Sequence, residues 1–356
     1  MIICVCSFSD SGREWEKVLK FQMPDVMWIV KSQEENAGDW IREKFVKHLP
    51  ILFIGSVGIA LRLISPLIKD KFTDGPVMVM DEGGRYIIPV LSGHIGGANE
   101  LSRFIASKIG ANPVITTATD VHGTFAVDVF ARKNAFKIIN RDCIKKVSEK
   151  ILSKKEITMK IPKDVDLGDE IIPEPVILLD DSDGDKVCDV EILNPESGSL
   201  FFQDLNRNTK TLYLLPKKYC IGIGCKKGKT FEELNAFLHK SLEREVIENI
   251  AAISSIDLKK NAEGLMTLAQ YYHVDFKTYS AAQLEGVELK EGEFSQSDFV
   301  KEITGVSNVC ERAALLCAEE MGKKDGAGLE LRKTAGEGIT LALATRSPKI
   351  ITWETL

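Results

Sequence analysis

The feature that most constrains the fold is a repeated alternation of short apolar runs with helix-like segments. Ile2–Phe8 and Val26–Val30 are apolar runs of strand length, and Trp15–Phe21 between them has the spacing of a helix. A short continuous apolar run is typical of a strand that is buried on both faces. Strand–helix–strand repeats form parallel sheets because each helix returns the chain to the same edge. The alternation therefore predicts an α/β fold with largely parallel sheets.

The same pattern continues to about residue 135. Val77–Asp81 and Tyr86–Val90 are strand-like and are joined by the tight turn Glu82-Gly83-Gly84-Arg85, so they predict a hairpin. We expect two or three loops of this region to gather at the carboxyl ends of strands, where open α/β sheets bind ligands. The other expected elements are strands at Ile51–Ile54 and within Asn112–Asp120, and helices near Asp39–His48, Ile59–Ile68, Leu101–Ile109 and Phe125–Lys133.

Composition changes after this region and then returns to the first pattern. Lys, Asp and Pro become frequent, and runs such as Val176–Leu179 and Thr211–Leu215 favour short strands. The chain of 356 residues also exceeds the usual size of one domain. We therefore predict two α/β domains, at residues 1–135 and 219–356, joined by a small β-rich middle module at residues 136–218. The elements expected in the last domain are strands at Tyr219–Ile223, Ile250–Ser254, Phe276–Tyr279 and Ile339–Ala344, and helices near Phe231–Arg244, Ala262–Tyr272, Ser297–Ile303 and Val309–Met321.

Composition also argues against several classes of protein. The chain is 44% hydrophobic, but it has no apolar run long enough to cross a bilayer, so we expect no membrane association. A net charge of −6 argues against nucleic-acid binding. The 8 cysteines form no C-x-x-C pair, which favours reduced thiols over a zinc site. Met1–Cys6 lacks the features of a signal peptide, so we expect a buried first strand and a cytoplasmic protein.

The segment Leu91–Glu100 is the strongest candidate for a functional loop. It places His94 among Gly93, Gly96 and Gly97 directly before a helical pattern. Glycines let main-chain N–H groups approach a ligand, a helix N-terminus favours anions, and histidine exchanges protons near neutral pH. The alternative is a histidine that serves only as a hydrogen-bonded strut.

Three other glycine-rich or acidic segments fit known motifs poorly. Gly222–Thr230 ends in Gly-Lys-Thr, but the first glycine of a P-loop would fall at Ile223, so we expect either an anion-binding loop or a solvated turn. Gly55–Gly58 is too short for a dinucleotide fingerprint and reads as a packing turn. Asp180–Asp185 lacks the closing glutamate of a calcium loop and reads as a solvated turn.

Taken together, long segments in both predicted domains resemble the cobalamin-biosynthesis protein CbiG family. The amino-terminal segments are Gly55–Arg62, Lys69–Lys71, Leu91–Glu100 and Val114–Asp120. The carboxyl-terminal segments are Ile221–Gly228, Ser255–Lys259, Tyr279–Leu284, Phe299–Val300, Gly305–Ala314 and Thr340–Ala344. The middle module carries no segment that matches.

The resemblance implies a cobalt-precorrin-5A hydrolase, which opens a δ-lactone on a cobalt corrinoid and releases acetaldehyde. Such chemistry needs a base that activates water, donors for the oxyanion, and proton transfer during carbon–carbon cleavage. On this basis His94, Glu100 and Glu311 are the candidate catalytic residues, with Glu311 expected to project into a cleft. The candidate oxyanion donors are the N–H groups around Gly96 and Gly97.

The implied substrate carries many carboxylates, so an acidic protein must concentrate positive charge locally to hold it. The candidate substrate-binding residues are Gly55, Arg62, Lys71, Gly96, Gly97, Asn99, Asp120, Cys225, Lys226, Lys227, Lys259, Arg312 and Lys333.

The resemblance also implies the cofactor and the partners. It implies no cofactor bound by the protein, because the cobalt arrives with the substrate, and it makes neighbouring methyltransferases of the pathway candidate partners. The competing interpretation is a non-catalytic corrinoid-binding or carrier protein, and a nucleotide-dependent enzyme ranks third.

Overall fold

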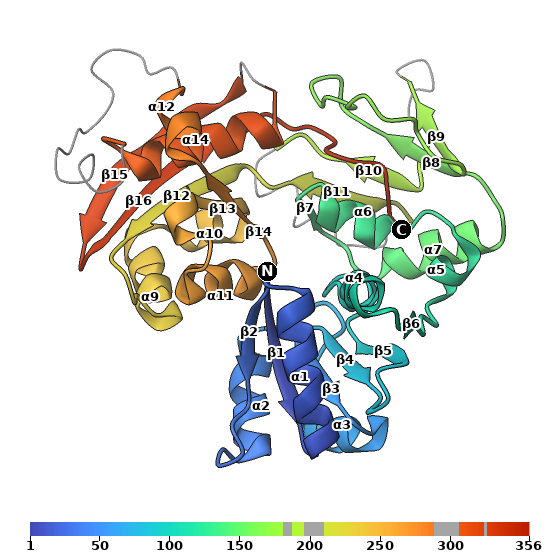
Figure 1. The fold of residues 1–356 in the computed structure, drawn as a ribbon. Coiled ribbons are helices and arrows are strands. Elements are labelled where there is room, and N and C mark those ends of the chain that lie inside the picture. The colour runs from blue at the N-terminus through green and yellow to red at the C-terminus, as the bar shows by residue number, and fades with distance from the viewer. Residues whose placement is uncertain (181–186, 196–209, 288–305, 324–325, 356) are drawn as a thin grey trace. The chain divides into compact units, whose positions relative to one another are not determined.

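The computed structural model describes residues 1–180, 187–195, 210–287, 306–323 and 326–355 (Figure 1). These residues form two compact units, Met1–Val121 with Met266–His273, and His122–Leu265 with Val274–Leu356. The predicted acidic turn at residues 181–185 and the predicted helix at residues 297–303 lie outside the described residues. The domain boundaries predicted at residues 135 and 218 remain a prediction.

A six-stranded sheet organises the first unit, in the order β2-β1-β3-β4-β5-β6. Its strands are β1 (Ile2–Ser7), β2 (Met27–Val30), β3 (Ile51–Ile54), β4 (Val77–Met80), β5 (Tyr86–Leu91) and β6 (Asn112–Pro113). The helices in this part of the chain are α1 (Asp10–Gln22), α2 (Ala37–Val46), α3 (Val57–Ile64), the 3-10 turn η1 (Ser65–Leu67), α4 (Ala98–Ile109) and α5 (Ala118–His122). The predicted strand–helix alternation is thus confirmed here.

The orientation of β5 decides where the functional loop lies. β1, β2, β3 and β4 are parallel, but β5 is antiparallel to β4, with Leu91 opposite Val77. The carboxyl end of β5 therefore lies at the edge where β4 begins. β6 is parallel to β5, so the chain leaves both strands toward the same edge. The loops after β5 and β6 thus gather at the carboxyl ends of their strands, whereas the loop after β3 lies at the opposite edge, because the hairpin of β4 and β5 reverses the chain.

The middle of the chain forms a second sheet, in the order β7-β11-β10-β8-β9. Its strands are β7 (Phe136–Ile138), β8 (Ile157–Lys160), β9 (Val176–Leu179), β10 (Val190–Ile192) and β11 (Leu212–Pro216), and the helices near it are α6 (Val127–Lys133) and α7 (Cys143–Leu152). Only β7 is antiparallel to its neighbour. The end of the chain returns to this region, where Trp353 stacks on Phe130 of α6 at 5.0 Å between ring centroids.

A third sheet, β14-β13-β12-β16-β15, belongs to the same unit. Its strands are β12 (Tyr219–Cys225), β13 (Ile250–Ile256), β14 (Asp275–Tyr279), β15 (Gly328–Gly336) and β16 (Ile339–Thr345). The helices in this part of the chain are α9 (Phe231–Ser241), α10 (Arg244–Glu248), η3 (Asp257–Lys259), α11 (Glu263–Tyr271), α12 (Ala281–Glu285) and α14 (Val309–Met321). β15 was not predicted, because as an edge strand with many polar side chains it lacks an apolar run.

Gly222 lets α14 pack directly on β12. A Cβ atom at Gly222 would lie 1.8 Å from the carbonyl oxygen of Cys310 and 2.7 Å from the nitrogen of Ala314. The facing residues of α14, Ala313, Ala314 and Ala318, are small and fully buried. The glycine that suggested an anion-binding motif therefore has a packing role, because no side chain fits at this contact.

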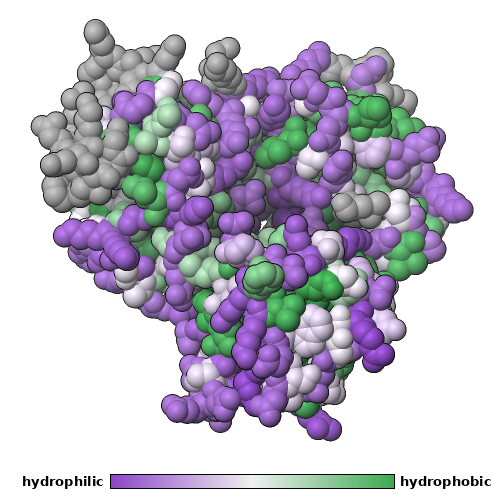
Figure 2. Space-filling model, in the orientation of Figure 1, coloured by the Kyte–Doolittle hydropathy of each residue, from purple (hydrophilic) through white to green (hydrophobic). Residues whose placement is uncertain are grey.

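Hydrophilic residues cover much of the face of the molecule in Figure 2, interrupted by scattered hydrophobic ones. Within the described ranges, every helix is too short or too polar to span a bilayer.

Candidate functional site

The segment from β5 to α5 brings three candidate residues of the first unit together. His94 lies in the loop that follows β5, and Asn99 lies in the first turn of α4. Asp120 lies on the short helix α5. Because β5 and β6 are parallel, the loop after β5 and the segment after β6 reach the same edge of the sheet.

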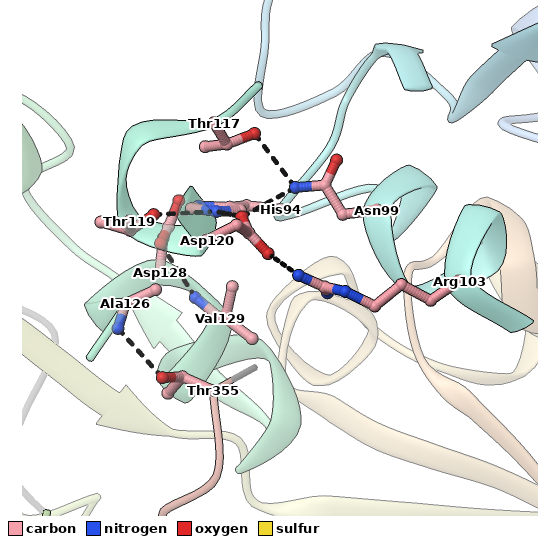
Figure 3. Close-up of polar contacts among 10 residues, drawn as sticks. All are labelled: His94, Asn99, Arg103, Thr117, Thr119, Asp120, Ala126, Asp128, Val129 and Thr355. Atoms are coloured by element: carbon pink, nitrogen blue, oxygen red, sulfur yellow. Dashed lines mark hydrogen bonds and ion pairs between the residues drawn. The ribbon is translucent and has the colours of Figure 1, made fainter. Parts of the chain in front are cut away.

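His94 and Asp120 form a hydrogen-bonded pair at the centre of this group (Figure 3). The His94 Nε2 lies 2.7 Å from the Asp120 Oδ2, and the two side chains are only 15% and 5% exposed. The Thr119 Oγ1 lies 3.1 Å from the same ring nitrogen. The structure thus brings into contact His94 and Asp120, which the sequence named separately.

Two further side chains hold the Asp120 carboxylate in place. The Asn99 Nδ2 donates to the Asp120 Oδ2 at 2.9 Å and to the Thr117 Oγ1 at 3.0 Å. The Arg103 Nη2 donates to the Asp120 Oδ1 at 2.5 Å (Figure 3). Sequence analysis missed Arg103, Thr117 and Thr119. The one signal for Arg103 was its place one helical turn after Asn99, which an ordinary surface arginine would share.

These contacts determine the protonation state of Asp120. Burial raises the pKa of this carboxyl, but the hydrogen bonds and charges of His94 and Arg103 outweigh burial and lower the pKa to about 2. Asp120 is therefore ionised at neutral pH and can only accept hydrogen bonds, so the His94 Nε2 carries the hydrogen in their bond. In neutral His94, Nδ1 is then the basic nitrogen.

The loop around His94 is held by its own main chain. The N–H groups of Gly97, Ala98 and Asn99 donate to the carbonyl oxygens of His94, Ser92 and Gly93 at 3.0–3.1 Å. The first-turn donors of α4 are thus bonded within the loop, and the predicted oxyanion donor at Gly97 is occupied by His94. The Gly96 N–H donates to no acceptor in the part of the chain that the structure describes.

Tight packing explains the glycines on either side of His94. A Cβ atom at Gly96 would lie 2.6 Å from the Cβ of Ser92, and one at Gly93 would lie 2.6 Å from the Asn99 Oδ1. Gly97 has a φ of 82°, which disfavours any residue with a side chain. Glycine at these positions therefore lets the loop close around His94.

The other candidates of the first unit lie apart from this pair. Gly55 lies directly after β3, at the opposite edge of the sheet from the end of β5, and its N–H donates to the Met80 oxygen at 2.8 Å. Arg62 and Lys71 are exposed, on α3 and after η1 respectively. Glu100 lies in the first turn of α4 and is partly exposed.

A second group of candidates lies at the carboxyl ends of β12 and β13. Cys225 ends β12 and Lys259 ends η3, which directly follows β13, and the two strands are parallel. Burial raises the pKa of the Cys225 thiol, while the nearby charges of Lys259 and Lys229 oppose this rise. Lys226 and Lys227 are exposed in the loop after Cys225. The strands thus bring Lys259 close to Cys225, which supports an electropositive loop here.

Glu311 does not project into a cleft, contrary to the expectation from sequence. The residue is 1% exposed. Its carboxylate accepts hydrogen bonds from the Asn308 side chain and, at 2.7 Å, from the main-chain N–H of Lys333. Asn308 in turn caps α14 by accepting from the Glu311 N–H. Glu311 therefore joins the start of α14 to β15 and holds the side chain of Asn308, the residue that caps the helix.

Arg312 is likewise bound within the protein. Its Nη1 donates to the carbonyl oxygens of Leu284 and Glu285 at 2.9 and 3.0 Å, and its Nη2 lies 3.4 Å from the Glu285 carboxylate. These bonds satisfy the last carbonyls of α12, which explains why the buried guanidinium is stable there.

Within the described residues, no group of three or more His, Cys, Asp or Glu side chains is arranged to hold a metal ion.

Two family models match this chain, one near each end. The family model "cobalamin synthesis G N-terminal" matches residues 39–120, and "cobalamin synthesis G C-terminus" matches residues 219–344. The first match includes His94, Asn99, Arg103 and Asp120.

Curated relatives match along most of the chain. Cobalt-precorrin-5A hydrolase of Salmonella typhimurium is 35% identical over 311 residues, which are 85% of this chain and 84% of that protein. Cobalt-precorrin-5A hydrolase of Priestia megaterium is 30% identical over 359 residues, 91% of this chain and 89% of that protein. A solved structure of a cobalamin biosynthesis protein G homolog from Sulfolobus solfataricus is 24% identical, covers 96% of both chains, and has a TM-score of 0.42.

Proposed function

We propose that this chain, which belongs to the cobalamin synthesis G family, is a cobalt-precorrin-5A hydrolase. The reaction opens the δ-lactone of the corrinoid and releases acetaldehyde. The single observation that carries an enzymatic role is the His94–Asp120 pair, in which a buried, ionised carboxylate orients a histidine. This is an arrangement that supports general acid–base catalysis.

In this proposal His94 acts first as the base. Its Nδ1 removes a proton from water, and the resulting hydroxide adds to the lactone carbonyl carbon. The Gly96 N–H is our proposed donor to the oxyanion. When the oxyanion collapses, the bond between the carbonyl carbon and the ring oxygen breaks, and the departing alkoxide takes the proton from His94.

The second step cleaves the carbon–carbon bond. His94 removes the proton of the new hydroxyl group, the adjacent carbon–carbon bond breaks, and acetaldehyde leaves. The electron pair of that bond passes to the macrocycle, which accepts a proton. Asp120 stabilises the imidazolium in both steps, while Asn99 and Arg103 keep the carboxylate in position.

Charge supports the proposed binding of the acidic macrocycle. In the second unit, Lys226, Lys227 and Lys259 offer cations for its carboxylates. Burial of Glu311 and the internal bonds of Arg312 remove these two residues from the proposed machinery.

We propose no protein-bound cofactor, because cobalt enters as part of the substrate. We also propose that the protein works in the cytoplasm beside the methyltransferases of the pathway.

The test is aldehyde release from cobalt-precorrin-5A by the purified protein. A coupled alcohol dehydrogenase assay should detect one acetaldehyde for each substrate molecule consumed. Binding of the corrinoid without any aldehyde would overturn the proposal and favour the carrier function.

A further inference from the structure

Lys217 lies outside the proposed site, where β11 passes into β12. Both of its main-chain polar groups are hydrogen-bonded: the N–H donates to the Ala135 oxygen at 2.9 Å, and the carbonyl accepts from the Arg346 Nε at 2.8 Å. The side chain is half-buried, and within the described residues its amine makes no ion pair or hydrogen bond. A half-buried lysine without a partner requires an explanation.

Two cations lie close to this amine. The Arg346 guanidinium is bound to the carbonyl group of Lys217 itself. Lys137 is opposite Leu215 in the pairing of β7 with β11, which makes it a diagonal neighbour of Lys217 on the same face. The Lys137 amine is paired with Glu248 at 3.0 Å, and Asp275 supplies the nearby negative charge.

We propose that Lys217 is a reactive amine that condenses with small aldehydes to form an imine. The uncharged nitrogen attacks the carbonyl carbon, the carbonyl oxygen leaves as water with two protons from the amine, and a carbon–nitrogen double bond forms. An amine next to other cations is a known arrangement for this chemistry. Acetaldehyde, the product under the proposed function, is an aldehyde of this class, although the reactivity itself does not depend on that function.

The environment favours the uncharged amine. Burial and, to a smaller extent, the charges of Lys137 and Arg346 lower the pKa of Lys217 to about 8, against the opposing charge of Asp275. At pH 7 an amine with this pKa is uncharged in about one molecule in ten, compared with about one in 2,500 for an ordinary lysine. A lower basicity weakens the nucleophile, so we expect a net rate advantage of at least about tenfold.

The experiment treats the full-length protein with acetaldehyde and a borohydride reductant, which traps each imine as an ethylated lysine. Peptide mass spectrometry should show Lys217 modified at least about tenfold faster than exposed lysines such as Lys210, with a half-maximal rate near pH 8. Lys217→Arg should lose this fast site alone. Lys137→Gln removes one neighbouring cation and should move the midpoint upward.

Modification of Lys217 at the rate of other lysines, or with a midpoint near pH 10, would overturn the inference. Because the aldehyde is added, a failed hydrolase assay leaves this test unaffected. An inert Lys217 in a chain that releases acetaldehyde would contradict this inference alone.

Discussion

At the scale of single residues, the account depends on one carboxylate. Asp120 accepts from His94, Asn99 and Arg103, so it fixes the hydrogen on the His94 Nε2 and leaves Nδ1 as the basic nitrogen. A carboxamide at this position could offer its NH₂ group to the ring and favour the other tautomer. The role of Asp120 is therefore to position and stabilise His94, and the sequence-based view of it as a substrate ligand stays a prediction.

The low pKa of Asp120 also predicts how stability depends on pH. The pKa of Asp120 is about 2 in the folded protein, compared with 3.8 for an ordinary aspartate in the unfolded chain. Ionised Asp120 therefore stabilises the fold by about 2 kcal/mol above pH 4. This contribution is lost as the pH falls from about 4 to 2. Asp120→Asn should thus be less stable than the wild type at pH 7, and the difference should shrink toward pH 2 in urea unfolding measured by circular dichroism.

Asp25→Asn is the matched control, because Asp25 is exposed in the same unit. Its unfolding should follow the wild type within about 0.5 kcal/mol at each pH. A deficit of Asp120→Asn that stays constant from pH 7 to pH 2 would contradict the assigned ion pairs.

At the scale of elements, the contact between β12 and α14 in the second unit leaves no room for a side chain at Gly222. Gly222 faces the main chain of α14, so an added methyl group would have to displace backbone atoms of Cys310 and Ala314. Gly222→Ala should lower the free energy of unfolding by at least about 2 kcal/mol, and thermal denaturation measures the loss.

Gly286→Ala provides the comparison for this substitution. A Cβ atom there would meet only the carbonyl oxygens of Ala282 and Gln283, at 3.4 and 3.5 Å, and the backbone is helical. This variant should melt within a few degrees of the wild type, because the site accepts alanine without strain. Equal melting temperatures for both variants would show that the α14 contact is not close.

At the scale of the whole molecule, the sequence predicted those elements whose positions are determined by the pattern of hydrophobic residues. Buried parallel strands such as β1, β3 and β13 appear as continuous apolar runs, so their positions were predicted closely. β6 consists of two exposed residues and β15 is an edge strand, so neither forms an apolar run from which its length could be predicted. The hairpin of β4 and β5 was predicted, but its consequence for the site was not: it places the loop after β5 at the opposite edge of the sheet from the loop after β3.

The candidate site was predictable only in part for a related reason. The glycines around His94 marked the loop, but its partners Thr119 and Asp120 lie on α5, about 25 residues later in the chain. Glu311 was misjudged because a buried structural carboxylate and a catalytic one can occupy the same first-turn position in sequence. Only the packing around each carboxylate distinguishes the two roles.

The most direct test of the central claim is the rate of acetaldehyde release by His94→Gln in single turnovers of cobalt-precorrin-5A. The account predicts a rate at least about 100-fold below the wild type, because general acid–base catalysis is lost. His122→Gln, which changes an exposed histidine two residues after Asp120, should retain the wild-type rate. A folded His94→Gln protein that releases acetaldehyde at the wild-type rate would contradict the assignment of His94 as the proton-transfer residue.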